Sequence, residues 1–228
     1  MDPDWRNMLY PIGFLANVLF AIRFAYQWFN SELKQKSVVD SRFWKISLLG
    51  NFIMVCHTMA QLQFGVCVIQ GWNGIISWRN LNLMKKPSKQ ARFWTVILRF
   101  FIVSAMIISG FLIQSWIFFD DKFVWARAPT FITDSSRHLP LYWHLLGIIG
   151  VILFACRFWV QWWRSEMHQK SQVGRTFWWI SLIGGGLSAA YFVMMFDPVN
   201  FIGPGLGLIP YVRNLMLIKK HRAQVAES

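Results

Sequence analysis

Polar residues recur at helical spacing inside the long apolar stretches of this sequence. Arg23, Gln27 and Ser31 follow one another at intervals of four residues, which places them on one face of a helix. Guanidinium groups suit phosphate or carboxylate, and amide side chains bind hydroxyl groups. Facing a cavity, such a stripe would bind an anionic sugar derivative. Facing the bilayer, the same arginine would extend to the interface as an anchor.

The stripe occurs twice. Residues 19–50 match residues 153–184 without a gap, so Arg157, Gln161 and Ser165 repeat the first stripe. A later stretch is repeated at the same spacing, with Arg79 and Asn80 matching Arg213 and Asn214. Four arginines at comparable depth predict an electropositive layer in the inner half of the protein. The candidate binding residues are Arg23, Gln27, Arg79, Asn80, Arg157, Gln161, Arg213 and Asn214.

Glu32 and Glu166 lie just beyond the two stripes. Each precedes a lysine, Lys36 or Lys170, by four residues, so a solvated ion pair along the helix is one interpretation. A gate at the inner mouth of the cavity is the other.

Pro204 and Pro210 lie in the last apolar segment, beside the glycines of residues 203–207. Proline removes a backbone donor, so both should kink a helix there and form a hinge. The glycines follow a membrane turn, not a strand, which argues against a nucleotide-binding loop.

The remaining reactive side chains do not assemble a catalytic centre. His57, His144 and Asp197 have no partner at catalytic or metal-ligand spacing in their own segments. The three cysteines all lie in apolar stretches, without a CxxC pair. We therefore predict no catalytic residues, no metal, no cofactor and no enzymatic activity.

The composition indicates that membrane helices position these residues. Of 228 residues, 55% are hydrophobic and only 14% are charged, and the mean hydropathy is +0.38. A crossing helix needs about 20 mostly apolar residues. Seven segments qualify: 10–29, 43–63, 64–84, 93–119, 142–163, 177–196 and 199–218.

The formal charge of +13 would suggest nucleic acid in a soluble chain, but the basic residues lie between the apolar segments. One set of loops and flanks carries fourteen Lys and Arg, and the opposite set carries four. Because basic loops stay cytoplasmic, the N-terminus should be outside and the C-terminus cytoplasmic. No nucleic-acid partner is expected.

The repeat divides the chain into three parts. We predict a first three-helix repeat at 1–86, a linker helix and outer loop at 87–140, and a second three-helix repeat with a cytoplasmic tail at 141–228. The linker helix restores the orientation, so both repeats run parallel. Parallel repeats are common in transporters, with the binding site between them.

Both repeats resemble the lipid A biosynthesis N-terminal domain family. The pattern of RF, QW, SE, FW, S, G and an aromatic residue near RN is complete in the second repeat, where the aromatic residue is Tyr211. In the first repeat Ser77 replaces this tyrosine. The resemblance adds Tyr211 to the candidate site. The domain is also similar to the three-helix bundles of SWEET and PQ-loop transporters, although no Pro-Gln dipeptide occurs here.

The resemblance implies work on bacterial envelope glycolipids. The family is named after a module of lipid-A-disaccharide synthase, whose activity we do not carry over, because this chain has no room for that glycosyltransferase. Some free-standing members resemble flippases of undecaprenyl-phosphate aminosugars. We therefore expect an inner-membrane flippase that moves such a lipid-linked sugar outward. The alternatives are a non-transporting subunit or scaffold of a membrane glycosyltransferase, and a SWEET-like facilitator of soluble sugars.

Overall fold

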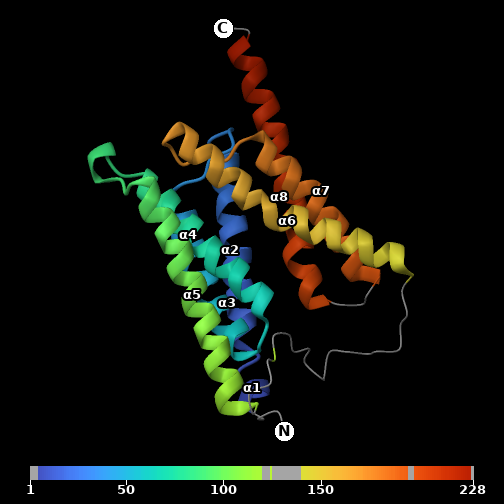
Figure 1. Ribbon diagram of the computed structural model, residues 1–228. Coiled ribbons are helices and arrows are strands. Elements are labelled where there is room, and N and C mark those ends of the chain that lie inside the picture. Colours follow the sequence, from blue (N-terminus) through green and yellow to red (C-terminus); the bar gives the residue numbers. More distant parts are fainter. Residues whose placement is uncertain (1–4, 120–123, 125–139, 195–197, 227–228) are drawn as a thin grey trace. The chain divides into compact units, whose positions relative to one another are not determined.

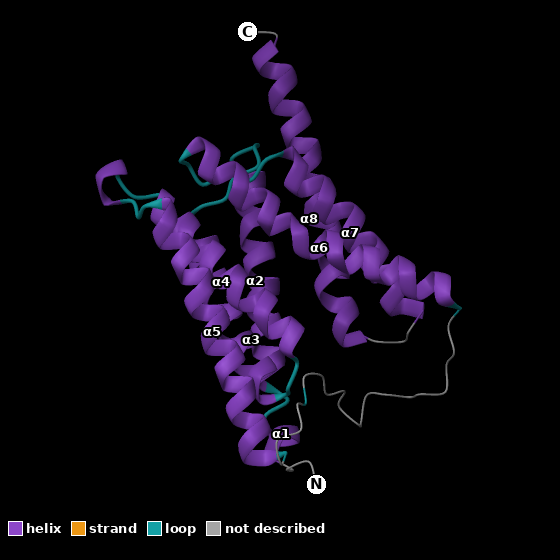
Figure 2. Cartoon of the chain, viewed as in Figure 1, coloured by secondary structure: helices purple, strands orange, loops and turns teal. Residues whose placement is uncertain are grey.

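A computed structural model describes residues 5–119, 124, 140–194 and 198–226, and the described elements are all helical (Figures 1 and 2). The helices are α1 (Trp5–Met8), α2 (Ile12–Leu33), α3 (Ser41–Ala60), α4 (Phe64–Leu83), η1 (Pro87–Lys89), α5 (Phe93–Phe118), α6 (Leu141–His168), α7 (Arg175–Met194) and α8 (Pro198–Ala226). The prediction of an all-α protein is confirmed.

Two helices at matching repeat positions end in the same way. Gln35 after α2 and Gln169 after α6 both have φ of 50°, the left-handed conformation that stops a helix. The next amide, of Lys36 or Lys170, donates to the serine carbonyl five residues earlier, at 3.2 Å in both cases. This is a Schellman motif, which supplies hydrogen-bond donors to carbonyls that would otherwise have none at the end of the helix. The repeat seen in the sequence therefore extends to the turns.

The chain folds into two compact units. Unit 1 contains residues 1–20 and 44–133, and unit 2 contains residues 21–43 and 134–228. Residues 21–43, which hold the later part of α2, the loop after it and the first residues of α3, thus belong with α6, α7 and α8. The three-part division by sequence repeat remains a prediction about the chain, and the compact units follow a different partition.

Unit 1 is held together by apolar packing and by a buried arginine. Leu62, Cys67, Ile107 and Phe111 form its buried apolar cluster. Arg6 is fully buried, and its guanidinium donates to the Ala60 carbonyl and, at 3.0 Å, to Gln114 Oε1. Arg6 is one of the four basic residues predicted to lie on the outer side, and α1 places its side chain inside the unit.

In unit 2, α6 packs against α7, and α7 packs against α8 (Figure 1). Glycines permit the close approach of α6 and α7. A Cβ atom at Gly184 would lie 2.6 Å from the Phe154 backbone nitrogen, and one at Gly150 would lie 2.7 Å from the Ser188 backbone nitrogen. Small residues at helix contacts are typical of membrane proteins, where close packing replaces hydrophobic burial as a driving force.

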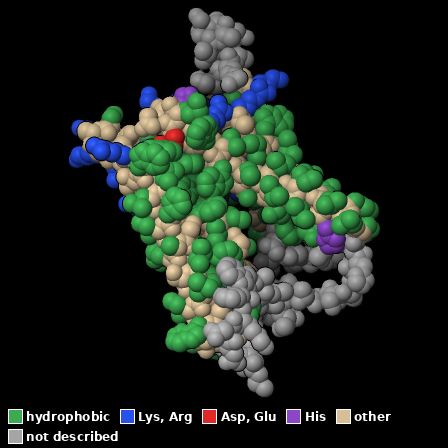
Figure 3. Space-filling view, viewed as in Figure 1, with side chains coloured by type: hydrophobic (Ala, Val, Ile, Leu, Met, Phe, Trp, Pro, Cys, Tyr) green, Lys and Arg blue, Asp and Glu red, His purple; other side chains and the backbone are tan. Residues whose placement is uncertain are grey.

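Five helical segments of the described chain are long and apolar enough to cross a membrane. They are residues 5–33, 87–118, 141–168, 175–194 and 201–220. Apolar side chains cover the visible sides of the helices, and Lys and Arg gather near helix ends (Figure 3). The prediction of seven spans is thus supported for five. Segments 43–63 and 64–84 form helices α3 and α4 but do not meet this criterion, because they contain buried polar residues such as Asn51, Thr58 and Asn80.

Candidate functional site

The candidate site in unit 2 begins with two buried arginines. Arg23 on α2 is 4% exposed, and Arg157 on α6 is 5% exposed. Both guanidinium groups lie near the ring of Phe158, at 5.6 Å for Arg23 and 4.7 Å for Arg157. Like charges this close repel each other strongly in a medium of low dielectric constant. Aromatic faces offset part of that cost through cation–π attraction.

Tyr211 of α8 completes this cluster. Its ring is fully buried and packs against Phe24 and Phe154, with ring centroids 5.6 and 6.4 Å away. The tyrosine lies close enough to both arginines for electrostatic interaction. We call Arg23, Arg157 and Tyr211 the arginine cluster. The structure thus brings together three residues that lie far apart in the sequence.

Arg157 Nε and Tyr211 Oη of the arginine cluster have no hydrogen-bond partner within the described residues. Arg157 makes one hydrogen bond, from Nη1 to the Phe154 carbonyl at 2.5 Å. A buried polar group without a partner costs about 1–3 kcal/mol. Both atoms are donors, so an anion that accepted from both would remove this cost and oppose the charge repulsion.

An amide network lies in the same unit. Asn214 of α8 and Gln27 of α2 exchange two hydrogen bonds, at 2.8 and 3.1 Å. Ser37 donates to Asn214 Oδ1 at 2.6 Å, and the Trp178 indole donates to Ser37 at 3.1 Å. Gln27, Asn214 and Ser37 thus fix α2 and its following loop to α8. The side-chain amides of Gln27 and Asn214 bind each other, which gives both residues a structural role.

The glutamine and serine of each stripe hold the loop that follows the helix. Gln161 donates to Ser165 at 2.8 Å, and Ser165 accepts from the Gln172 amide at 3.1 Å. The same arrangement joins Gln27, Ser31 and Val38, at 2.9 and 3.1 Å. Sugar binding by the two glutamines stays a prediction, and the structure shows their contacts with the loops.

Arg213 differs from the two buried arginines. It is 37% exposed and forms a bidentate ion pair with Glu32, in which Nη2 donates to Oε2 at 2.7 Å. Glu32 therefore pairs with a residue of α8 rather than with Lys36, because the helix packing of unit 2 brings Arg213 nearer. Glu166 is buried and accepts from the Trp162 indole at 3.0 Å. The gate assigned to the two glutamates stays a prediction.

Arg79 and Asn80 belong to unit 1. Arg79 is buried and donates to Asn82 Oδ1 at 2.9 Å and to the Ala91 carbonyl at 2.8 Å, which holds the loop after α4. Asn80 is also buried, and it donates to the Ile76 carbonyl at 2.9 Å. Unit 2 thus holds three of the four arginines, the buried Arg23 and Arg157 and the more exposed Arg213, and Arg79 lies in unit 1. The layer of four arginines stays a prediction.

The two prolines lie inside a continuous α8. The Pro210 carbonyl accepts from Asn214 Nδ2 at 2.8 Å, so a side chain binds a carbonyl in the proline region. The hinge at Pro204 and Pro210 stays a prediction. Asp197 lies outside the described residues.

No described group of three or more His, Cys, Asp and Glu residues could hold a metal ion. His144 contacts the Tyr191 hydroxyl at 3.0 Å, and His57 packs against the Tyr10 ring with centroids 5.5 Å apart. These contacts account for both histidines as packing residues.

The phenylalanine residues around the arginines were not among the predicted site residues. Phe24 and Phe158 follow Arg23 and Arg157 directly, and each guanidinium lies over the ring of its neighbour at 4.5 and 4.7 Å. The repeated Arg-Phe dipeptide in the sequence could have indicated that each arginine packs on the following ring. Ser37 and Trp178 were also missed, and nothing in their spacing linked them to Asn214.

These observations define an all-helical protein with candidate membrane spans and a tandem repeat. The Lipid A Biosynthesis N-terminal domain matches residues 12–82 and again residues 146–216. The chain therefore belongs to this family, which confirms the resemblance inferred from the sequence. No solved structure matches the chain.

Curated relatives are named lipid-A-disaccharide synthase. The chain is 36% identical over 220 residues to the protein of Chlamydia felis, 34% over 219 residues to that of Chlamydia abortus and 32% over 220 residues to that of Chlamydia pneumoniae. In each case the match covers 94% of this chain and 34% of the relative. The chain thus spans about a third of the length of these relatives.

The relatives overturn two predictions. A flippase or transporter was expected, but the similar proteins are named lipid-A-disaccharide synthase. A protein without enzymatic activity was expected, but the relatives carry the name of an enzyme. The flippase prediction rested on the repeat, the arginines and a family-level analogy, which say little about the chemistry of a site. The prediction of no enzymatic activity rested on the lack of a catalytic constellation and of room for a glycosyltransferase in this chain.

Proposed function

We propose that this chain is the membrane-embedded, substrate-binding part of a lipid-A-disaccharide synthase. In this role it binds an acylated aminosugar phosphate in the membrane and holds it for glycosyl transfer. The family match and the synthase relatives support the reaction context. The candidate membrane spans are consistent with a lipid-linked substrate.

The observation that carries the proposal is the arginine cluster. Arg157 Nε and Tyr211 Oη are buried donors without a partner in the described chain, beside a second buried arginine. Phosphate on an acylated sugar supplies several acceptor oxygens and negative charge, and planar guanidinium groups match its geometry. A neutral sugar has acceptor oxygens but no negative charge to oppose the two buried arginines, so the cluster favours the phosphorylated lipid.

The finer topology is part of the same proposal. We place seven crossings in the bacterial inner membrane, with the N-terminus outside and the C-terminus in the cytoplasm. The excess of Lys and Arg in one set of loops and flanks supports this orientation. A membrane glycosyltransferase partner, or a catalytic part like the remaining two thirds of the relatives, would then meet the substrate at the cytoplasmic face.

A binding experiment tests the site. The purified chain in lipid nanodiscs would be titrated with a radiolabelled acylated aminosugar phosphate and with its phosphate-free analogue. We expect saturable binding of the phosphate form, weakened about tenfold or more by Arg157→Met, since a hydrogen bond to a charged group contributes about 1.5–3 kcal/mol. Arg99→Met is the matched control, because Arg99 lies over the Trp78 ring at 3.8 Å in unit 1. Equal binding of both lipids by folded protein would reject the site.

A chimera tests the reaction context. The region of the Chlamydia felis synthase that matches this chain would be replaced by the chain itself, and disaccharide formation would be measured in membranes. We expect activity with the wild-type sequence and a loss of activity with Arg157→Met, at equal amounts of membrane-inserted protein. Equal activity of both chimeras would show that the cluster does not serve the synthase.

A further inference from the structure

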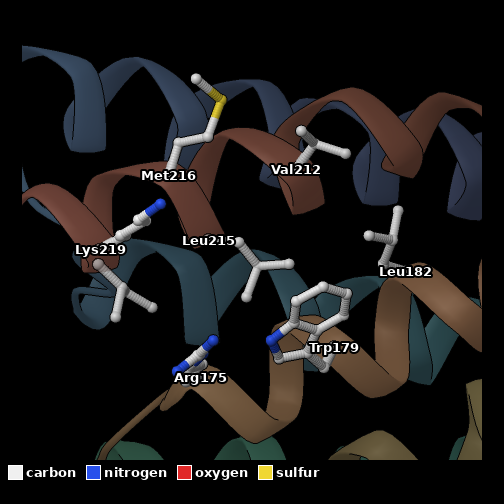
Figure 4. Close-up of a pocket in the computed structure, with 8 residues that line it drawn as sticks. Arg175, Trp179, Leu182, Val212, Leu215, Met216 and Lys219 are labelled. Atoms are coloured by element: carbon white, nitrogen blue, oxygen red, sulfur yellow. The ribbon is translucent and has the colours of Figure 1, made fainter.

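A groove of about 420 Å³ runs between α7 and α8 in unit 2 (Figure 4). Its lining residues are Arg175, Trp179, Leu182, Val212, Leu215, Met216, Ile218 and Lys219. Six of these eight side chains are apolar or aromatic. Val212 and Met216 are 44% and 54% exposed, so the groove opens on the surface of the unit.

The groove is basic at one end and apolar at the other. Arg175 begins α7, and Lys219 lies on the neighbouring turn of α8, so the two cations lie together (Figure 4). Leu182 and Val212 form the opposite end. From Arg175 to Leu182 the helix rises about 10 Å, at 1.5 Å per residue. The groove thus has the polarity of an amphiphile with an anionic head.

Neither cation of the groove has a hydrogen bond or ion pair within the described residues. The next lysine, Lys220, does not line the groove, and its ammonium group donates to Gln35 Oε1 at 3.1 Å. By contrast, Arg164 near the same loop donates to Thr176 at 2.7 Å. Arg175 and Lys219 are therefore available to a ligand, and the Trp179 indole lies beside them (Figure 4).

We propose that this groove is a binding site for a phospholipid with a net negative head group. One acyl chain lies along Trp179, Leu215 and Met216, and the lipid phosphate lies between Arg175 and Lys219. This site is separate from the arginine cluster and does not rest on the proposed function, since it assigns a lipid of the surrounding membrane rather than the sugar-bearing substrate.

The charges, not the apolar lining, give this site its selectivity. An acyl chain gains little by leaving the bilayer for the groove, because both surroundings are apolar. Zwitterionic and anionic phospholipids should therefore fit the groove equally. The two cations favour the anionic lipid, as basic residues at a membrane surface do.

Native mass spectrometry of the detergent-purified chain tests the site. The chain would be titrated with phosphatidylglycerol, which is anionic, and with phosphatidylcholine, which is zwitterionic. We expect tighter binding of phosphatidylglycerol, by about tenfold, and loss of this preference in the double variant Arg175→Gln, Lys219→Gln. The double variant Lys85→Gln, Lys86→Gln removes the same charge from an exposed loop of unit 1 and should keep the preference.

A second variant tests the groove itself. Met216→Trp fills the space for the acyl chain and should weaken binding of both lipids, whereas Ile209→Trp, at a 65% exposed position of α8 that does not line the groove, should not. The proposal is overturned if the Lys85, Lys86 variant loses the preference equally, or if Met216→Trp binds as the wild type does.

Discussion

At the scale of single residues, the most informative group is the Tyr211 hydroxyl. It is buried within electrostatic range of the two arginines of the cluster and has no hydrogen-bond partner in the described chain. Even Gly207, one turn earlier, lies so close that a Cβ there would be 2.2 Å from this oxygen. A buried group that costs stability and is enclosed by glycine and aromatic rings is typical of a site kept for a ligand.

Replacement of Tyr211 by phenylalanine separates binding from stability. The variant removes only the unpaired hydroxyl, so we expect the free energy of unfolding in detergent to rise by about 1 kcal/mol. Binding of the acylated aminosugar phosphate should weaken about tenfold, because one donor to the phosphate is lost. Thermal unfolding and lipid titration measure the two effects. A less stable protein with unchanged binding would contradict the assignment.

Asn214 gives the opposite prediction. Its side chain satisfies Gln27, Ser37 and the Pro210 carbonyl, so Asn214→Ala leaves buried polar groups without partners. We expect the free energy of unfolding to fall by roughly 2 kcal/mol, seen as a lower melting temperature in detergent. The control is Asn30→Ala, whose half-buried side chain makes no hydrogen bond among the described residues. A similar loss in both variants would argue against the network.

At the scale of the elements, glycine placement controls the packing of unit 2. Gly184 and Gly186 lie two residues apart on α7, but only Gly184 contacts the backbone of α6. Added atoms at Gly186 would meet nothing within 4 Å. Because helix backbones cannot shift as side chains do, the two positions should tolerate alanine very differently.

The pair Gly184→Ala and Gly186→Ala tests this packing. We expect Gly184→Ala to lower the free energy of unfolding by about 1–3 kcal/mol, through separation of α6 and α7. Gly186→Ala should be neutral or stabilising, because alanine favours a helix over glycine by about 1 kcal/mol. Melting temperatures of the purified variants provide the measurement. If Gly184→Ala were as stable as Gly186→Ala, the contact between α6 and α7 would tolerate a small shift, contrary to this prediction.

The pattern of apolar residues predicted where the helices lie, but it did not always predict where they end. Segments 64–84 and 93–119 agree closely with Phe64–Leu83 and Phe93–Phe118. The last segment was predicted to end at residue 218, but α8 continues to Ala226. An apolar run marks the part of a helix that lies in the membrane, and a helix continues into polar residues when nothing stops it.

At the scale of the whole molecule, local chemistry was predictable and distant pairing was not. The i,i+4 spacing placed Gln161 and Ser165 on one helix face, where the structure joins them by a hydrogen bond, although a binding role was predicted. The ion pair of Glu32 with Arg213 joins residues 181 apart, so only the packed fold could reveal it. The error about transport has the same origin, because the repeat described symmetry and not the chemistry that the relatives perform.

The crossing of α3 and α4 can be tested at Gly65, an exposed residue where added atoms meet nothing within 4 Å. In a protein whose three free cysteines are replaced, Gly65→Cys should react with a membrane-impermeant maleimide from outside intact cells. Ser88→Cys, in the exposed basic loop after α4, should react only after the membrane is opened. Labelling of Gly65→Cys only in opened cells would leave five crossings instead of seven.

The composition of unit 2 has a consequence for how this chain can be divided. Gln27, Glu32 and Ser37 come from the first repeat, yet their partners Asn214 and Arg213 come from the second. A gene cut between the repeats would therefore yield a second fragment in which the buried amide of Asn214 and the partly exposed guanidinium of Arg213 lack their partners. Each fragment should be degraded when it is produced alone. When the two fragments are produced together, they should assemble into a stable protein.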